Sequence, residues 1–428
     1  MRTEIALNGN ERPDARFIGW SPVPAAIRLS DTTGATGPVK VRLRNQNTTK
    51  GGQVVFFSSI PGTGQDQLDV TLPTNGRSVK FQVAGRFQRP SIDDRDATVE
   101  VIDVGTNQIL GSKPIMVRVR KNAMVLTTGE RNRFIAAFAT LNDRGRGRFA
   151  DFRNVHTSAG DPEAHGRAGF LPWHRAFLLD LERELQLIDA SVALPYWRFD
   201  QPAPKVFNRD FMGVPDPSTG TVQFSPSNPL QFWATDGTTG INRRPLFNTQ
   251  TQAAQSLEFG PAISEANTLA LGNRFLAFRG MEGNPHGSAH ISFTGSISSI
   301  PTAAKDPLFF MLHANVDRLW AKWQWVNHRF DVTDVNTFTF LGKAGDAGST
   351  RVGHNLKDTM WPWNQVITSP RPATAPGGTM APSPLVNVPG LRPTVGSMVD
   401  FQGVLTPGSR LGFDYDDVPF EFIVRPTP

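Results

Sequence analysis

Histidine is the residue whose positions in this chain most strongly suggest chemistry. The sequence contains eight histidines, and six of them form two groups of three. The first group follows the spacing H-x8-H-x8-H and consists of His156, His165 and His174. The second group begins with two histidines four residues apart, which places them on one helix face, and consists of His286, His290 and His313. The other two histidines are His328 and His354.

Two groups of imidazoles in a chain without cysteine indicate metal sites with nitrogen ligands. Neutral imidazole binds zinc, copper, iron and nickel. A single three-histidine zinc site would use one group only, and non-haem iron in its usual site would need a carboxylate in each group. Two three-histidine sites that face each other across a helix bundle suit a copper pair that binds dioxygen between the ions. The alternative is that these histidines are ordinary buried polar groups with hydrogen-bond partners.

The residues around the histidines are predicted to form helices. After Pro172, apolar residues and one histidine recur on a single helix face, namely His174, Leu178, Leu181 and Leu185. Asn284 is expected to cap a short helix that starts at Pro285. Two further helices are predicted over residues 130–142 and 308–328, because apolar residues recur there at helical spacing.

Residues 1–119 are predicted to form β-strands. Val39, Val41 and Leu43 alternate with charged residues, and the same alternation recurs further along this region. Short alternating strands separated by Gly, Pro, Asn and Asp clusters are typical of an antiparallel sandwich. Residues 120–428 hold the predicted helices and all eight histidines, and we expect them to form a second domain. In its later part we also expect strands near 401–404 and 420–424.

The composition argues against several classes of function. Hydrophobic residues make up 39% of the chain and charged residues 19%, as in ordinary globular proteins. The net charge of +6 is spread over 428 residues without a basic run, so we expect no nucleic-acid partner. No apolar stretch suits a membrane helix, and the N-terminus lacks a signal peptide. With the absence of cysteine, this favours a cytoplasmic over a secreted protein.

Two long segments of the chain resemble the copper motifs of the tyrosinase and polyphenol oxidase (catechol oxidase) family of type 3 dicopper proteins. The first motif is similar to HGRAGFLPWHRAFLLDLERELQ at 165–186. The second is similar to MEGNPHGSAH at 281–290 followed by IPTAAKDPLFFMLHANVDRLW at 300–320. The resemblance runs from Val119 to Tyr415, and it leaves the N-terminal β region outside, as an addition to a bacterial-like member. It implies a mainly α catalytic domain in which a four-helix bundle holds the dicopper centre.

The resemblance implies two copper ions, Cu A and Cu B, with dioxygen as co-substrate. Cu A would be bound by His156, His165 and His174, and Cu B by His286, His290 and His313. The implied substrates are small phenols and catechols. The implied reactions are oxidation of o-diphenols to o-quinones and a slower ortho-hydroxylation of monophenols.

Five further residues match positions that have a role in the family. Glu282 resembles the carboxylate that orients a water near the copper pair. Gly287 follows His286 at a position where strong monophenol hydroxylases often carry asparagine, which puts phenol hydroxylation in doubt. Ile300 matches the gate position over Cu B and should leave the entrance open. Phe309 is expected to pack against ligand imidazoles, and Asp317 to hold the free N–H of a ligand histidine.

Three alternatives to this function are kept. One is an oxygen carrier resembling haemocyanin, another is a catechol oxidase without monophenolase activity, and the third is a binding protein with a vestigial copper domain. A copper chaperone is a further candidate partner, and the oligomeric state is left open. Because 13 residues follow Tyr415, we expect no C-terminal lid and no need for cleavage.

Overall fold

The computed structural model describes residues 1–12, 14–46, 50–157, 160–340, 352–383 and 385–422. The chain divides into two compact units, which are described one at a time. Unit 1 consists of Met1–Val119, Ser383–Asn387 and Gln402–Pro428. Unit 2 consists of Arg120–Pro382 and Val388–Phe401. Two segments that we placed in the second domain from the sequence are therefore grouped with the N-terminal strands.

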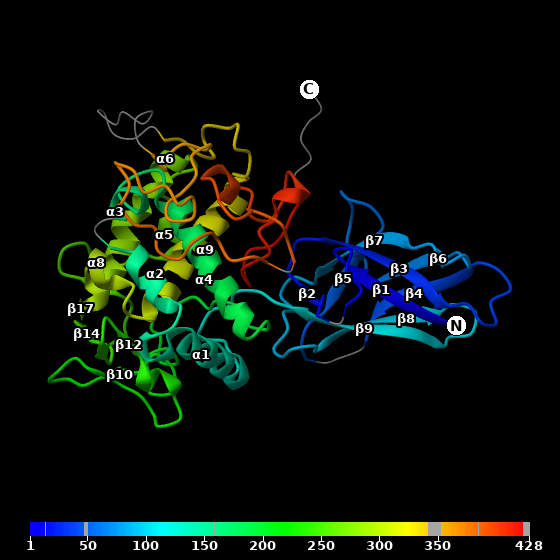
Figure 1. Cartoon of the computed structure of the whole chain (residues 1–428), viewed down its shortest axis with the longest axis horizontal. Helices are drawn as coiled ribbons and strands as arrows, with labels where there is room; N and C mark the ends of the chain where they lie inside the picture. The colour runs from blue at the N-terminus through cyan, green and yellow to red at the C-terminus, as the bar shows by residue number, and fades with distance from the viewer. Residues whose placement is uncertain (13, 47–49, 158–159, 341–351, 384, 423–428) are drawn as a thin grey trace. The chain divides into compact units, whose positions relative to one another are not determined.

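The N-terminal part of unit 1 is built of β-strands, drawn in blue to cyan in Figure 1. Its strands are β1 Arg2–Leu7, β2 Phe17–Ile18, β3 Val23–Asp31, β4 Val39–Asn45, β5 Val54–Phe57, β6 Gln67–Leu72, β7 Val79–Gly85, β8 Ala97–Asp103 and β9 Ile109–Val117. They form a four-stranded sheet in the order β1-β3-β7-β5 and a five-stranded sheet in the order β2-β9-β8-β4-β6. All pairs are antiparallel except β2 with β9.

The alternation in the sequence determines which side chains of unit 1 are buried. In β4 the apolar residues Val39, Val41 and Leu43 are buried, whereas the intervening Lys40 and Arg42 are not. Successive side chains of a strand point to opposite faces, so each sheet has one apolar face. Both sheets contribute to a single hydrophobic cluster, which includes Ile27 from the first sheet and Val41 from the second. The β region predicted for the N-terminus is confirmed at this level.

Unit 2 contains the helices and a set of very short strands. The helices are α1 Thr128–Asn142, α2 Phe149–Val155, α3 Asp161–Ala164, α4 Phe170–Ile188, α5 Glu265–Leu269, α6 Phe275–Phe278, α7 Ser288–His290, α8 Ile300–Ala303 and α9 Leu308–Asn327. The strands are β10 Val214–Pro215, β11 Val222–Gln223, β12 Ala234–Thr235, β13 Thr238–Thr239, β14 Arg243–Pro245, β15 Gln255–Ser256, β16 Gly260–Pro261 and β17 Phe293–Gly295. The long helices predicted over 130–142 and 308–328 are confirmed as α1 and α9. No helix in the described part of the chain could cross a membrane.

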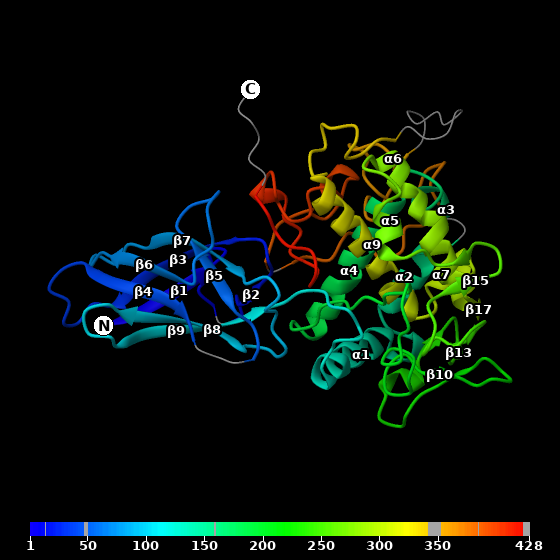
Figure 2. The same ribbon diagram turned by 180° about the vertical axis from the view of Figure 1, so that it is seen from behind.

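Helices α4 and α9 lie side by side and are buried along most of their length (Figures 1 and 2). The sequence predicted one apolar face for α4, but its charged residues Arg175, Asp180 and Glu182 are buried as well. A buried charge is tolerated only when it is paired or hydrogen-bonded. Asp180, for example, accepts hydrogen bonds from Trp363 Nε1 at 2.8 Å and from Ala381 N at 2.7 Å. The irregular C-terminal segments thus satisfy the polar groups of the central helix.

The segment after residue 401 does not form the strand predicted near 401–404. Its residues make turns instead, and the second predicted strand, near 420–424, lies partly outside the described residues. In place of a strand ladder, the segment places Asp414 in a buried position of unit 1. Asp414 Oδ2 accepts a hydrogen bond from Trp20 N at 2.8 Å, and its Oδ1 accepts one from Gln402 Nε2 at 2.7 Å. The approach is close, because a Cβ on Gly19 would lie 2.0 Å from Asp414 Oδ2.

Burial raises the pKa of Asp414 from 3.8 to about 6. The folded chain therefore holds more protons than the unfolded chain between these pH values, and its free energy of unfolding falls as the pH rises from about 4 to about 6. A pKa shift of this size lowers the free energy of unfolding above pH 6 by about 3 kcal/mol, relative to its value below pH 4.

Asp414→Asn should therefore raise the melting temperature at pH 7.5, because it removes the charge and keeps the shape. The new amide would face Gln402, whose Oε1 is buried without a hydrogen-bond partner and can accept from it after a flip of the glutamine side chain. Thermal unfolding at pH 7.5 and at pH 4 checks this prediction. At pH 4 the two proteins should unfold at similar temperatures, and a variant that is less stable at pH 7.5 would contradict it.

Candidate metal centre

The first three histidines come together from three elements of unit 2. His156 follows the last residue of α2, His165 lies in the bend between α3 and α4, and His174 lies in the second turn of α4. Their ligand nitrogens all lie within 4.8 Å of one another. His156 and His174 are buried and His165 is half-buried. The regular spacing in the sequence thus corresponds to a real cluster, although three different elements build it.

The other three histidines form a second cluster. His286 belongs to a helical turn over Gly283–Gly287, His290 ends α7, and His313 lies in α9. Their ligand nitrogens also lie within 4.8 Å of one another. The rings of His174 and His313 stack at 4.2 Å with an interplanar angle of 10°, so the two clusters are direct neighbours.

The helical turn that carries His286 does not begin as predicted. Asn284 has φ −141° and ψ 122° and caps no helix. Its side chain donates hydrogen bonds to Phe259 O at 3.0 Å and Pro261 O at 3.1 Å, and it accepts one from Ile263 N at 3.0 Å. An asparagine amide offers both donors and an acceptor, and here it satisfies the backbone of the β15–β16 hairpin rather than a helix end.

Backbone carbonyl groups orient four of the six imidazoles through Nδ1. The pairs are His156 with Ile300 O at 3.0 Å, His174 with Phe170 O at 2.9 Å, His286 with Glu282 O at 2.7 Å and His290 with Ile297 O at 2.7 Å. A carbonyl can only accept, so Nδ1 carries the hydrogen in each neutral ring and Nε2 keeps a lone pair.

Three of the lone pairs left on Nε2 have no donor among the described residues. The Nε2 atoms of His156, His174 and His286 are buried without a hydrogen-bond partner. The Nε2 atoms of His290 and His313 lie 3.0 Å apart. Buried polar atoms are rarely left unsatisfied in proteins. Nitrogen lone pairs that converge in two groups of three are the donor set that a metal ion bound by three histidines requires.

Burial keeps these imidazoles neutral. Loss of water contact lowers the pKa of His156, His174, His286 and His313 well below 6.5, and it lowers the pKa of His290 to about 4. Metal ligation needs the neutral form. The unfolded chain takes up these protons near pH 6.5, so the contribution of these groups to folding is present above that pH and is lost as the pH falls.

Phe309 packs against imidazoles of both clusters and is fully buried. Its ring centroid lies 4.6 Å from that of His156 and 4.2 Å from that of His313. Because the ring contacts imidazoles of both clusters, it limits how far these imidazoles can turn.

Asp317 has a different role from the predicted one. Its Oδ1 accepts a hydrogen bond from Arg175 Nε at 2.6 Å, and its Oδ2 accepts one from Arg120 at 3.1 Å. His313 Nδ1, which lies one turn before Asp317, has no hydrogen-bond partner. The carboxylate therefore joins α9 to α4 instead of holding an imidazole. Since Arg175 follows His174 directly, this buried ion pair fixes the two helices that carry His174 and His313.

A cavity of about 860 Å³ opens beside the two clusters. Its wall includes four of the histidines, His156, His165, His286 and His290, and also Glu282, Gly287 and Ile300. Glu282 Oε1 accepts a hydrogen bond from Gly166 N at 2.6 Å. The Ile300 residue is 43% exposed, so it leaves the cavity open to a small molecule. All three residues singled out from the sequence thus lie in the cavity wall.

The segment 162–169, which runs from α3 to the start of α4 and carries His165, is held by His354. Gly169 N donates a hydrogen bond to His354 Nδ1, and His354 Nε2 donates one to Pro162 O, both at 3.0 Å. Burial lowers the pKa of His354, which keeps Nδ1 free to accept. The packing is tight, because a Cβ on Gly169 would lie 2.6 Å from His354 Nδ1. The imidazole of His354 is thus hydrogen-bonded to the backbone at both ends of this segment.

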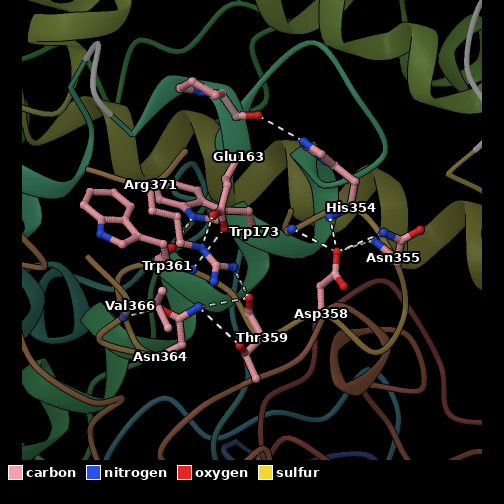
Figure 3. A network of polar contacts seen from close by, with 12 residues as sticks. Glu163, Trp173, His354, Asn355, Asp358, Thr359, Trp361, Asn364, Val366 and Arg371 are labelled. Carbon is pink, nitrogen blue, oxygen red and sulfur yellow. Dashed lines mark hydrogen bonds and ion pairs between the residues drawn. The ribbon is translucent and has the colours of Figure 1, made fainter. Parts of the chain in front are cut away.

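The segment that supplies His354 is itself fixed by a polar network, shown in Figure 3. Asp358 accepts a hydrogen bond from His354 N at 3.2 Å and further bonds from the two neighbouring backbone N–H groups. Glu163, on the histidine-bearing loop, accepts a bond from Trp361 N at 3.1 Å and one from Arg371. The network therefore connects the irregular segment 353–371 to the first cluster.

The sequence did not identify the groups that orient the ligands. The carbonyls of Phe170 and Glu282 precede their histidines by four residues, which is a helical spacing that could have been noticed. The carbonyls of Ile297 and Ile300, and the side chain of His354, act across longer separations in the chain. Their role depends on the path of the backbone, which residue spacing does not reveal.

The sequence of this chain is similar to those of proteins named tyrosinase. The family model described as "Common central domain of tyrosinase" matches residues 146–326. The tyrosinase of Streptomyces glaucescens is 34% identical over 285 residues, which cover 59% of this chain and 94% of that protein. The tyrosinase of Streptomyces antibioticus is 33% identical over 277 residues, covering 58% of this chain and 93% of that protein.

The chain belongs to the tyrosinase family. A weaker similarity links it to haemocyanin A-type of Enteroctopus dofleini, which is 28% identical over 233 residues, covering 48% of this chain and 18% of that protein. The cofactor of this tyrosinase-family chain is a pair of copper ions, and dioxygen is the co-substrate. The donor set fits copper, because six imidazoles without any cysteine are ligands that copper accepts.

His174→Ala should reduce the copper content from two ions per chain to one. The substitution removes one of three ligands from the first cluster and leaves the three ligands of the second. Metal analysis after gel filtration measures the result, with His328→Asn as the control, because His328 is exposed at the end of α9 with φ 54°, which asparagine tolerates. Two tightly bound coppers in the His174 variant would contradict the assignment.

His354→Ala should weaken copper binding at the first cluster alone, by roughly tenfold, the lower end of the range seen when residues that orient metal ligands are removed. His354→Asn should retain part of the affinity, because its amide oxygen can still accept from Gly169 N. Competition with a copper chelator measures both affinities. If His354→Ala released both coppers equally or neither, His354 would not position His165.

Proposed function

We propose that this protein is a dicopper polyphenol oxidase that uses dioxygen to oxidise o-diphenols to o-quinones and hydroxylates monophenols more slowly. The observation that carries the proposal is the convergence of neutral imidazoles, with unpaired Nε2 atoms, beside an open cavity of about 860 Å³. Similarity to proteins named tyrosinase supports the same reaction. The copper pair, when bound, supplies the exchange of electrons between the phenolic substrate and dioxygen.

We assign the six histidines to two ions. His156, His165 and His174 would hold Cu A, and His286, His290 and His313 would hold Cu B. The grouping of ligand nitrogens within 4.8 Å in each set supports this division. Backbone carbonyl groups fix the orientations of the ligand rings. The ion pair of Arg175 with Asp317 fixes the distance between α4 and α9, which carry His174 and His313.

We assign the substrate side of the site to three residues in the cavity wall. Ile300 lies at the opening and admits an aromatic ring. Glu282 is half-buried, and its carboxylate is held by Gly166 N at 2.6 Å, which fixes its position as the acceptor for a phenol proton passed through a water molecule. A general base works best when it is held within hydrogen-bond reach of the proton. Gly287 provides no side chain to share that water.

We also propose two finer features of the fold. The two sheets of residues 1–119 form a sandwich, supported by their common hydrophobic cluster. The elements that carry the histidines, α2, α4, α7 and α9, represent a four-helix bundle within a catalytic domain of residues 120–428, although α2 has 7 residues and α7 has 3. A copper chaperone and a cytoplasmic location stay predictions from the sequence, and the oligomeric state stays open.

The second candidate function is an oxygen carrier of the haemocyanin type. A carrier needs its copper site closed to phenols, whereas here Ile300 and the cavity leave the site accessible. The test is oxygen uptake by the copper-loaded protein on 4-methylcatechol and on the matching phenol, p-cresol, without detergent or protease. Rapid uptake with catechol and a slower, lagging uptake with the phenol are expected. Oxygen binding without turnover of either would favour the carrier.

Gly287→Asn should raise the ratio of monophenol to diphenol rates by about tenfold, if its amide restores one hydrogen bond of about 1.4 kcal/mol to the water beside Glu282. The backbone permits the change, since Gly287 has φ −58° and ψ −44°. A Cβ there would lie 3.2 Å from the ring of Phe259. Phe259 is 45% exposed, so its ring has room to move.

Gly287→Ala is the matched control, because it brings the same contact with Phe259 without an amide. Steady-state rates on p-cresol and 4-methylcatechol, at equal copper content, decide the matter. A ratio that rises equally in both variants would show that crowding, and not the hydrogen bond, changed the reaction. A ratio unchanged in Gly287→Asn would show that Gly287 does not limit hydroxylation.

A further inference from the structure

Arg167 is the one positively charged side chain among the described residues that line the cavity. Glu282 is the one carboxylate among the described residues of the same wall. Apart from the copper ions, the wall therefore presents one arginine cation and one carboxylate to any molecule that enters. These two charges bear on what the cavity accepts.

Arg167 has no anionic partner among the described residues. No residue in the described part of the chain forms a hydrogen bond or an ion pair with its guanidinium group, although the side chain is half-buried. The other arginines in the interior of unit 2 behave differently. Four of the buried ones contact a carboxylate at 2.5–2.8 Å, namely Arg120 with Glu182, Arg175 with Asp317, Arg243 with Asp306 and Arg318 with Glu265. The fifth, Arg183, donates hydrogen bonds to Ala381 O and Val388 O.

A partly desolvated cation without a partner costs free energy, and an anion bound beside it recovers that cost. The neighbouring carboxylate does not pair with it, because no ion pair joins Glu282 to Arg167 among the described residues, and Glu282 Oε1 accepts a hydrogen bond from Gly166 N instead. The guanidinium thus keeps its donors available to a molecule in the cavity. Its planar fork suits a carboxylate, which it can bind through two parallel hydrogen bonds.

The backbone that carries Arg167 is held in place on both sides. Gly166 N is bound to Glu282, and Gly169 N is bound to His354 Nδ1 at 3.0 Å. The same loop carries His165, two residues before Arg167. A fixed backbone reduces the entropy that binding must remove, because only the side-chain torsions of the arginine are left to order. The loop consequently holds the backbone of Arg167 at a fixed separation from the first histidine cluster.

We propose that Arg167 binds a carboxylate on the phenolic substrate, so that the preferred substrates are phenols and catechols with an acid group on the side of the ring away from the hydroxyls. This inference rests on the proposed oxidase function, because it assumes that the hydroxyl end of the ring lies at the histidine clusters. Arg167 then selects among substrates and takes no part in the oxidation itself.

The test compares two catechols of equal size, 3-(3,4-dihydroxyphenyl)propanoate and its uncharged amide, with the copper-loaded full-length protein. The wild type should use the acid with the higher kcat/KM. Arg167→Gln should lower kcat/KM for the acid by roughly 10- to 100-fold, mainly through KM, as expected for loss of a hydrogen bond to a charged group. The amide should be affected little. Arg167→Lys should give an intermediate loss, because it keeps the charge without the fork.

Arg279→Gln is the matched control. Like Arg167, Arg279 is a positive charge that acts on His354, but it does not line the cavity. Its replacement therefore tests whether loss of a nearby positive charge alone changes kcat/KM for the acid. Equal use of acid and amide by the wild type would overturn the proposal. So would equal losses on both substrates in Arg167→Gln, or an equal loss on the acid in Arg279→Gln. Failure of the wild type to oxidise either catechol would instead refute the proposed function.

Discussion

The structure depends on the burial of neutral imidazoles, and the Nε2 lone pairs of His156, His174 and His286 have no donor among the residues that the structure describes. Each Nδ1–H that faces a carbonyl is satisfied, so the unsatisfied atom is the one that points into the cluster. Such an arrangement is costly in the empty protein, because buried polar atoms lose hydration without a replacement. Two copper ions remove that cost. Burial thus lowers the stability of the protein without metal. The same burial keeps these ligands deprotonated at neutral pH.

Most of unit 2 serves to hold these rings. Helices α4 and α9 each supply one histidine, and the buried pair of Arg175 with Asp317 fixes one helix against the other. The irregular segment 353–371 fastens the loop of His165 through His354. Phe309 fills the space between the clusters. We expect the loss of any of these interactions to shift the imidazole rings before it unfolds the chain. Copper affinity should therefore respond more strongly than the free energy of unfolding.

The two histidine groups, the long helices α1, α4 and α9 and the N-terminal strands could be predicted from the sequence, because they rest on residue type and local period. The function of Asp317 could not, since its partners Arg120 and Arg175 are distant in the chain. Asn284 was assigned to a helix end because local spacing favoured it, whereas the hairpin at 255–263 supplies its partners. The strand predicted near 401–404 does not form, for the same reason. Contacts with residues distant in the chain, and not the local sequence pattern, determine the conformation of this segment.

The central claim is that the two clusters hold two copper ions side by side. Anomalous diffraction at the copper edge from crystals of the copper-loaded protein tests it most directly. We expect two peaks about 3.5–4 Å apart, each about 2 Å from three imidazole nitrogens. One peak should be surrounded by His156, His165 and His174, and the other by His286, His290 and His313. A single peak shared by both clusters, or copper bound elsewhere in the chain, would contradict it.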